Sequence, residues 1–409
     1  MRLGTLRGVQ RVATNVRQRG CGRWAATSDP GDRPDMLPVR VNVDEDGTLR
    51  AGIGNLQSCG SWYCTRCGPK ISIERAAETA HMLRVWAALG HSAVLLTLTA
   101  RHHRGHRLDD LIRGMRGAWR STWNGKAGTA LRDRMGVEWR IRVIEVTHGD
   151  AHGWHPHFHV LIFRAGPQPW LDTPDGRAAA RDAFRPVWTR WAAGLARLGF
   201  DALDEVDGES AGFDVRPVDL ESEEAIRAMA EYVEKGSGAR ETRRVRGVRT
   251  PAMSAGIELL GGVFKRGGAP EATVGARHRS IAQVMEDYAV ASGAEDESLV
   301  REFLAAAHGL RQRDPSKGMR AWFAAMAEEL GIPGPLLAEE RTDDEIAAAD
   351  DVADSTTVGW ISARAWSSYL VFEYHQLRGV ARVGGLAALV AWLDRRDAGF
   401  EWAESLRLT

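Results

Sequence analysis

The run His155-x-His157-x-His159 places three imidazoles at alternate positions of a short hydrophobic stretch. Because successive side chains of a β-strand point to opposite faces, the three histidines share one face while Phe158 and Val160 can enter a core. A His-x-His pair on one strand is a common source of two metal ligands. The pattern therefore predicts a strand with a metal site on its open face. The alternative is a surface strand whose histidines only form hydrogen bonds.

A carboxylate ligand is expected on the preceding strand. The runs 140–147 and 154–163 flank a polar turn, which predicts a β-hairpin. For a hairpin loop centred near residues 150–151, opposed residues have numbers that add up to about 301–302. A sum of 302 places Glu145 opposite His157 and close to His159. Two neutral imidazoles and one carboxylate suit Mn²⁺, Mg²⁺, Fe²⁺ or Zn²⁺ and leave positions open for a substrate.

Tyr232 stands on a predicted helix over 222–235, and Lys235 follows it by about one turn. Apolar residues at spacings of three and four predict a buried stripe on this helix, with Tyr232 at its edge. A nucleophilic tyrosine needs an activated phenol, which a nearby cation or metal ion provides. Taken alone, Tyr232 is ordinary packing and Lys235 an i,i+4 partner of Glu231, so the pair is a catalytic candidate only beside the histidine strand.

Four cysteines lie in the first 67 residues, as Cys21 and the trio Cys59-x4-Cys64-x2-Cys67. Three thiols within nine residues match the way in which zinc knuckles present thiolates to a tetrahedral ion, and Cys21 is the natural fourth ligand. We therefore predict a structural zinc site. A redox Cys-x-x-Cys motif would leave Cys21 and Cys59 without a role, and ordinary buried thiols are the remaining alternative.

Helices and strands alternate around these residues. We expect helices over 75–90, 108–123, 177–198 and 222–235, and strands over 94–99, 140–147, 154–163 and 212–218. This order predicts the α+β class, with an antiparallel sheet and helices on one or both of its faces.

The composition divides the chain into four expected segments. They are a cysteine-rich zinc-binding segment over 1–75, a domain with the histidine strand and Tyr232 over 76–240, a basic Gly-rich connector over 241–275, and an acidic, mostly helical region over 276–409. A linker is expected over 341–357 within the last segment.

Charge is segregated along a chain whose formal net charge is zero. Residues 1–200 hold 30 basic and 17 acidic groups, whereas residues 201–409 hold 24 basic and 37 acidic groups. A basic half indicates a polyanionic partner. High-GC codon usage would explain why arginine outnumbers lysine, but it would not explain the segregation.

The composition also excludes several classes of protein. A hydrophobic content of 44% with 26% charged residues argues against wholesale disorder. No apolar run approaches the length of a membrane span, and the start of the sequence contains no signal-peptide pattern. We therefore expect a soluble, cytoplasmic protein without a membrane partner.

The motifs together resemble the rolling-circle replication initiators of plasmids from Gram-positive bacteria, notably actinomycetes, within the HUH endonuclease superfamily. The family takes its name from a His-hydrophobe-His motif, here His157-Phe158-His159. The strand Leu96-Thr97-Leu98-Thr99 resembles its first motif, and the pair Tyr232 and Lys235 resembles its Tyr-x-x-Lys motif on a helix. The cysteine pattern ahead of them also resembles replication proteins of this type.

The resemblance implies a mechanism. His157, His159 and Glu145 would hold Mn²⁺ or Mg²⁺ at the scissile phosphate of single-stranded DNA at a plasmid origin. Tyr232 would attack the phosphate and form a 5′-phosphotyrosyl link, leaving a 3′-OH that primes DNA synthesis. Lys235 would stabilise charge or orient the phosphate.

Other roles implied by the resemblance are less specific. His155 would be a further ligand, a support for the ligands or a DNA contact. The basic half would bind backbone phosphates. The resemblance does not cover the acidic C-terminal region, whose candidate roles are to recruit a host helicase or polymerase or to recognise duplex DNA.

Three other classes of protein share some of these features. A conjugative relaxase or a transposase of the same superfamily would use the same chemistry. A histidine-triad nucleotide hydrolase fits the alternate histidines but gives Tyr232 no role. In a zinc-dependent, non-catalytic DNA-binding repressor the histidines would be incidental.

Overall fold

The computed structural model describes residues 3–26, 33, 35–44, 46–203, 212–234, 278–335, 342–348 and 355–403. The chain divides into two compact units. The central unit comprises residues 68–340, and the terminal unit combines residues 1–67 with residues 341–409. No helix within the described residues has both the length and the apolar character that crossing a bilayer requires.

An antiparallel sheet forms the middle of the central unit, with its strands in the order β6-β3-β5-β4-β7 and with β8 paired to another part of β4. The strands are β3 (Ser92–Thr99), β4 (Val137–Gly149), β5 (Gly153–Arg164), β6 (Phe213–Val218), β7 (His278–Ser280) and β8 (Arg313–Pro315). The predicted hairpin of β4 and β5 is confirmed. Opposed residues have numbers that add up to 302, from Trp139 and Phe163 to Gly149 and Gly153.

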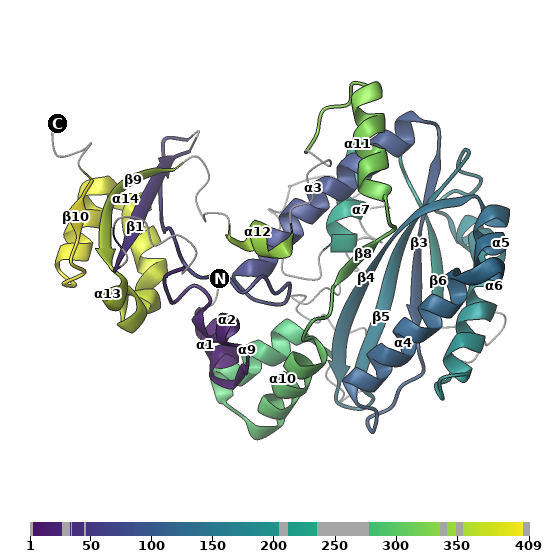
Figure 1. Ribbon diagram of the computed structural model, residues 1–409, viewed down its shortest axis with the longest axis horizontal. Coiled ribbons are helices and arrows are strands. Elements are labelled where there is room, and N and C mark those ends of the chain that lie inside the picture. The colour runs from purple at the N-terminus through teal and green to yellow at the C-terminus, as the bar shows by residue number, and fades with distance from the viewer. Residues whose placement is uncertain are drawn as a thin grey trace. The chain divides into compact units, whose positions relative to one another are not determined.

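Helices cover both faces of this sheet (Figure 1). One face packs against α4 (Leu108–Trp123) and α6 (Pro174–Ala196), and the other against α3 (Cys67–Ala88), α7 (Glu223–Glu234) and α11 (Met319–Glu329). The alternation of β5 produces this arrangement. Phe158 contacts the rings of Trp119 and Trp191 on the first face, whereas Leu161 and Phe163 enter the core on the second.

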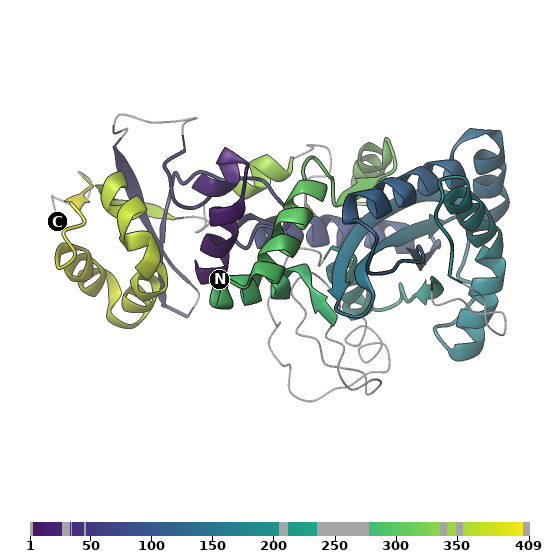
Figure 2. The ribbon, with the colours of Figure 1, turned by 90° about the horizontal axis from the view of Figure 1, so that it is seen from below.

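Shorter helices complete the central unit. They are α5 (Gly125–Met135), α9 (Ile281–Ala291) and α10 (Ala294–Ala306). The latter two lie beside the hairpin end of the sheet (Figure 2). Arg279 of β7 fixes this end, because its guanidinium contacts Asp287 of α9, Asp296 of α10 and Asp150 of the hairpin turn at 3.1, 2.7 and 3.7 Å.

The terminal unit has its own sheet, in the strand order β10-β9-β1-β2. Its core gathers Leu37, Val39, Ile361, Trp366 and Leu393, which are all buried. The elements are α1 (Leu3–Val12), α2 (Val16–Gly20), β1 (Met36–Val43), β2 (Leu49–Ile53), α12 (Asp343–Ala348), β9 (Thr356–Ser362), α13 (Ala363–Ser368), η2 (Leu370–Glu373), α14 (Tyr374–Asp394) and β10 (Glu401–Trp402).

The predicted α+β class is confirmed, with antiparallel sheets, flanking helices and a largely helical C-terminal region. The compact units, however, differ from the four predicted segments. The expected region 276–409 is divided, because β9 pairs with β1 in the terminal unit while α9 to α11 belong to the central unit. Pairing between strands more than 300 residues apart leaves no local pattern in the sequence.

Two further expectations concern the connecting segments. The linker predicted over 341–357 contains α12 and the start of β9, so part of it is regular structure. The connector predicted over 241–275 lies outside the described residues.

A buried carboxylate on α3 ties two later elements to the central unit. Glu78 lies 3.0 Å from Arg75, 3.6 Å from Arg313 of β8 and 2.6 Å from Arg320 of α11. Burial by itself raises the pKa of Glu78, but the charges of Arg313, Arg320 and Arg75 outweigh burial and lower that pKa below its ordinary value. The carboxylate therefore stays ionised at neutral pH and holds the three arginines together.

We predict that Glu78→Gln lowers the free energy of unfolding at pH 7 by about 3 kcal/mol or more, because it leaves buried guanidinium groups without their counter-charge. A lowered folded-state pKa stabilises the protein above the unfolded pKa, and this contribution disappears as the pH falls. The difference from wild type should therefore shrink below about pH 4.5. Urea unfolding at several pH values measures it. The exposed Glu138→Gln is the control, and an equal loss in both variants would contradict the assignment.

Candidate functional site

Glu145 on β4 and His157 and His159 on β5 meet at one place on the sheet. The register pairs Glu145 directly with His157. The Nε2 atoms of His157 and His159 lie 2.8 and 2.9 Å from the same carboxylate oxygen, Oε2 of Glu145. Their candidate ligand atoms all lie within 4.8 Å of one another, so these three side chains could hold one metal ion.

The environment of Glu145 suits a cation. The carboxylate is buried, and its other oxygen, Oε1, has no hydrogen-bond partner. Burial raises the pKa of Glu145, but the charges and hydrogen bonds of His157 and His159 outweigh it and lower the pKa to about 2. Burial lowers the pKa of His159, which favours its neutral form. An ionised carboxylate with a free oxygen beside a neutral imidazole is a donor set for Mn²⁺, Mg²⁺ or Zn²⁺.

Thr97 of β3 orients one of the imidazoles. It pairs with His159 across the sheet, and its Oγ1 lies 3.2 Å from Nδ1 of His159. With Nδ1 engaged, Nε2 faces Glu145, which is the arrangement that fixes a histidine ligand at a metal site. Thr97 belongs to the strand that resembles the first motif of the family, a resemblance that assigns no role to its hydroxyl. The alternation of Thr97 and Thr99 on the expected strand was the available signal.

Tyr232 on α7 reaches the same site from outside the sheet. Ile226, Ala230 and Val233 bury one side of the helix against β5 and β6, which places Tyr232 over His159. The phenolic oxygen lies 3.4 Å from Nδ1 and 3.5 Å from Nε2 of His159, and the two rings meet edge to face at 5.2 Å. The structure therefore brings together Tyr232 and the three predicted ligands.

The phenol of Tyr232 is held in its protonated form. Burial and then the negative charge of Glu145 raise the pKa of Tyr232 well above its ordinary value. Arg216 of β6 opposes this effect, and its neighbour Asp214 adds to it. Asp214 pairs with Thr97 in the sheet and accepts a hydrogen bond of 2.7 Å from Arg216. No pattern in the sequence points to these two residues, because only the order of strands in the sheet brings β6 beside β3.

His155 does not join this group of ligands. Its ring stacks on His102 at 4.5 Å with an interplanar angle of 17°, and it lies 5.8 Å from the ring of His278. Burial lowers the pKa of His155 well below its ordinary value, so it is neutral. Lys235, the other predicted residue of the tyrosine motif, lies outside the described residues.

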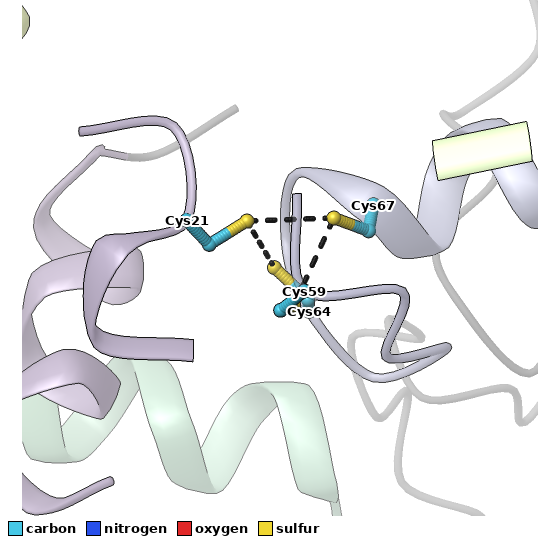
Figure 3. A group of neighbouring side chains, drawn as sticks. All are labelled: Cys21, Cys59, Cys64 and Cys67. Atoms are coloured by element: carbon cyan, nitrogen blue, oxygen red, sulfur yellow. Dashed lines mark hydrogen bonds between the residues drawn. The ribbon is translucent and has the colours of Figure 1, made fainter. Parts of the chain in front are cut away.

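The four cysteines converge in the terminal unit (Figure 3). Sγ of Cys21 lies 3.4 Å from that of Cys67 and 3.7 Å from that of Cys64, and the Sγ atoms of Cys59 and Cys67 are 3.8 Å apart. Four sulfurs at about 2.3 Å from a tetrahedral zinc ion lie about 3.8 Å from one another. All four thiols are free and buried, so the cluster could bind Zn²⁺.

Local backbone geometry produces this cluster. Gly22 and Gly60 have φ values of 68° and 64°, a region that glycine adopts without strain, and each directly follows a cysteine. The side-chain amide of Gln10 on α1 donates a hydrogen bond of 2.9 Å to the carbonyl of Cys21. Cys67 begins α3, so the ligands come from two loops and the start of a helix.

Comparisons with known proteins give partial similarity. The chain is 29% identical over 215 residues to a protein from Streptomyces lividans named "Protein rep", covering 44% of this chain and 46% of that one. It is 29% identical over 136 residues to a protein from Streptomyces cyanogenus named "Neomycin resistance protein", covering 27% of this chain and 31% of that one. The chain thus spans less than half the length of these relatives. No family model and no solved structure matches it.

We predict that the purified chain carries one zinc ion, which elemental analysis by mass spectrometry measures. Cys64→Ser should lose this zinc and unfold at a lower temperature, because three sulfurs cannot complete the tetrahedral shell. Thr65→Ser, in the same loop, should keep it. A full zinc content in Cys64→Ser would contradict the assignment.

We also predict that Mn²⁺ binds at Glu145 independently of the cysteines. Isothermal titration calorimetry with Mn²⁺ should show one binding site in the wild type. It should show none in Glu145→Gln, because this change removes the carboxylate of the ligand group. Thr97→Val should weaken binding about 10-fold or more, as expected for a group that orients a ligand. Glu138→Gln on the same strand should bind as wild type does. Unchanged affinity in Glu145→Gln would place the ion elsewhere.

Proposed function

We propose that the chain is a plasmid replication initiator of the HUH type, a metal-dependent endonuclease that nicks one DNA strand at a plasmid origin. The observation that carries the proposal is the position of the Tyr232 hydroxyl beside the group formed by Glu145, His157 and His159. A tyrosine nucleophile next to a two-histidine, one-carboxylate site is the set of groups that phosphodiester transfer to a tyrosine needs.

The chemistry follows from the charges around the phenol. Mn²⁺ or Mg²⁺ bound by Glu145, His157 and His159 would supply a Lewis acid for a phosphate oxygen and offset the negative charge that raises the pKa of Tyr232. The Tyr232 oxygen then forms a bond to phosphorus as the phenol loses its proton. The bond from phosphorus to the 3′ oxygen breaks, and that oxygen takes up a proton. The products are a 5′-phosphotyrosyl link and a 3′-OH primer.

The DNA is proposed to be single-stranded at the moment of cleavage. The phenol and the ligands lie on the face of the sheet that α7 covers, and an unpaired strand would bring a phosphate to them without a second strand. The basic character of residues 1–200 supplies the attraction for the backbone. Lys235 is proposed to assist by binding the phosphate.

The comparisons support the plasmid setting. The relative from Streptomyces lividans is named "Protein rep", and the similarity to it covers 44% of this chain. A relaxase or a transposase of the same superfamily would use the same chemistry at another DNA site, so the position of the nick separates these proteins from an initiator. A histidine-triad hydrolase leaves the position of Tyr232 unexplained.

We predict a covalent adduct as the direct sign of this reaction. Single-stranded oligonucleotides tiled across the DNA that flanks the gene, labelled at the 3′ end, are incubated with the full chain and Mn²⁺ and resolved on a denaturing protein gel. A labelled protein band should form from tiles of the origin. Tyr232→Phe should lose the band completely, because it lacks the attacking oxygen.

Tyr369→Phe is the matched control, because it removes a phenolic oxygen that is exposed and only bonds to backbone carbonyls of residues 396 and 397. It should form the adduct as the wild type does. If no tile gives an adduct with folded, zinc-loaded protein, the nicking mechanism is wrong and a DNA-binding repressor becomes the better explanation.

A further inference from the structure

A groove of the terminal unit gathers four arginines and two exposed aromatic rings. Its volume is about 310 Å³, at the lower end for small-ligand sites. Cys21 also lines it, so the cysteine cluster forms part of its wall. We call it the arginine groove. Its charged and aromatic side chains are Arg7 and Arg11 on α1, Arg19 on α2, Arg23 and Trp24 after α2, and Phe372 on η2.

The structure describes no carboxylate paired with an arginine of the arginine groove. Within the described residues, none of its four arginines forms an ion pair, whereas Arg17 close by is paired with Asp344. Burial and then the positive charges of Arg23 and Arg11 lower the pKa of Arg7. The Nη2 atom of Arg7 is buried and has no hydrogen-bond partner among the residues that the structure describes. Like charges held together in this way favour binding of an anion.

The aromatic rings of the arginine groove are fixed and partly exposed. Trp24 is 38% exposed, and its ring packs on the backbone of Gly20, where a Cβ atom would come within 2.2 Å of it. Phe372 is 40% exposed, and the guanidinium of Arg7 stacks over it at 2.8 Å from the ring centre. Fixed, exposed rings beside arginines are the elements of a surface that binds unpaired bases and their phosphates.

We propose that the arginine groove is a second nucleic-acid site, which binds a short segment of single-stranded DNA. The arginines contact its phosphates, and Trp24 stacks on a base. The proposal rests on the proposed function for the identity of the polyanion, but it concerns a different unit and different residues. The cysteine cluster supports the groove, because Gln10 of α1 bonds to the carbonyl of Cys21 and so fixes the arginines of α1 beside Trp24.

The test measures binding without cleavage. The full chain carries Tyr232→Phe, and fluorescence anisotropy follows a labelled oligo-dT of about 20 nucleotides over a range of salt concentrations. Arg11→Ala with Arg19→Ala should weaken binding and reduce the slope of log K against log salt by about 1.4, as expected for two lost phosphate contacts. The pair Arg382→Ala and Arg395→Ala, exposed on the terminal unit outside the groove, makes the same change of charge and should leave the slope unchanged.

A second pair of variants isolates the stacking. Trp24→Ala should weaken binding about fivefold or more, the loss expected for one stacked base. Trp402→Ala, which removes an equally exposed tryptophan of the terminal unit outside the groove, should not weaken it. A duplex of the same length should compete less well than the single strand. Zinc content shows that each variant retains a folded terminal unit.

Two results would overturn the proposal. The first is an equal loss of affinity for oligo-dT in the groove variants and their controls. The second is a duplex that competes as well as the single strand does, together with wild-type affinity in Trp24→Ala. The outcome is separate from that of the proposed function. If the groove variants lose DNA binding but the wild type forms no adduct at Tyr232, only the nicking reaction is refuted. If the wild type forms the adduct but the groove variants bind DNA normally, only the groove proposal is refuted.

Discussion

The pairing register of β4 and β5 creates the candidate site. It sets Glu145 opposite His157 and next to His159, so that two imidazoles converge on one buried carboxylate oxygen. A slip of one residue would turn every side chain of one strand to the other face and separate these groups. Burial of Phe158 between α4 and α6 and of Phe163 in the opposite core makes such a slip costly, so the packing of the sheet holds the ligands in place.

The position of Tyr232 depends on a second constraint, the packing of α7 on the same face of the sheet. The stripe that buries Ile226 and Val233 leaves Tyr232 above His159. In this position, burial and the negative charge of Glu145 raise the pKa of the phenol. In the proposed reaction, a cation held by Glu145 would offset this charge, so activation of the tyrosine would depend on occupation of the proposed metal site.

Local patterns predicted much of this arrangement. Alternation along residues 154–163 and the polar turn before them predicted the hairpin and two possible registers, of which the structure has the one with a sum of 302. Helical spacing predicted α4 with the observed bounds. Contacts between distant elements could not be predicted in this way. The pairing of β9 with β1, the stacking of His102 on His155 and the groove between α1 and Phe372 all depend on which elements the fold brings together.

The most direct measurement is anomalous diffraction from crystals of the full chain grown with Mn²⁺. If Glu145, His157 and His159 hold a metal ion, a manganese peak should lie within about 2.5 Å of all three, with the Tyr232 oxygen beside them. A zinc peak among the four cysteines serves as an internal control for occupancy. A zinc peak without manganese at Glu145, or manganese bound at another place, would show that these three residues are not the metal site.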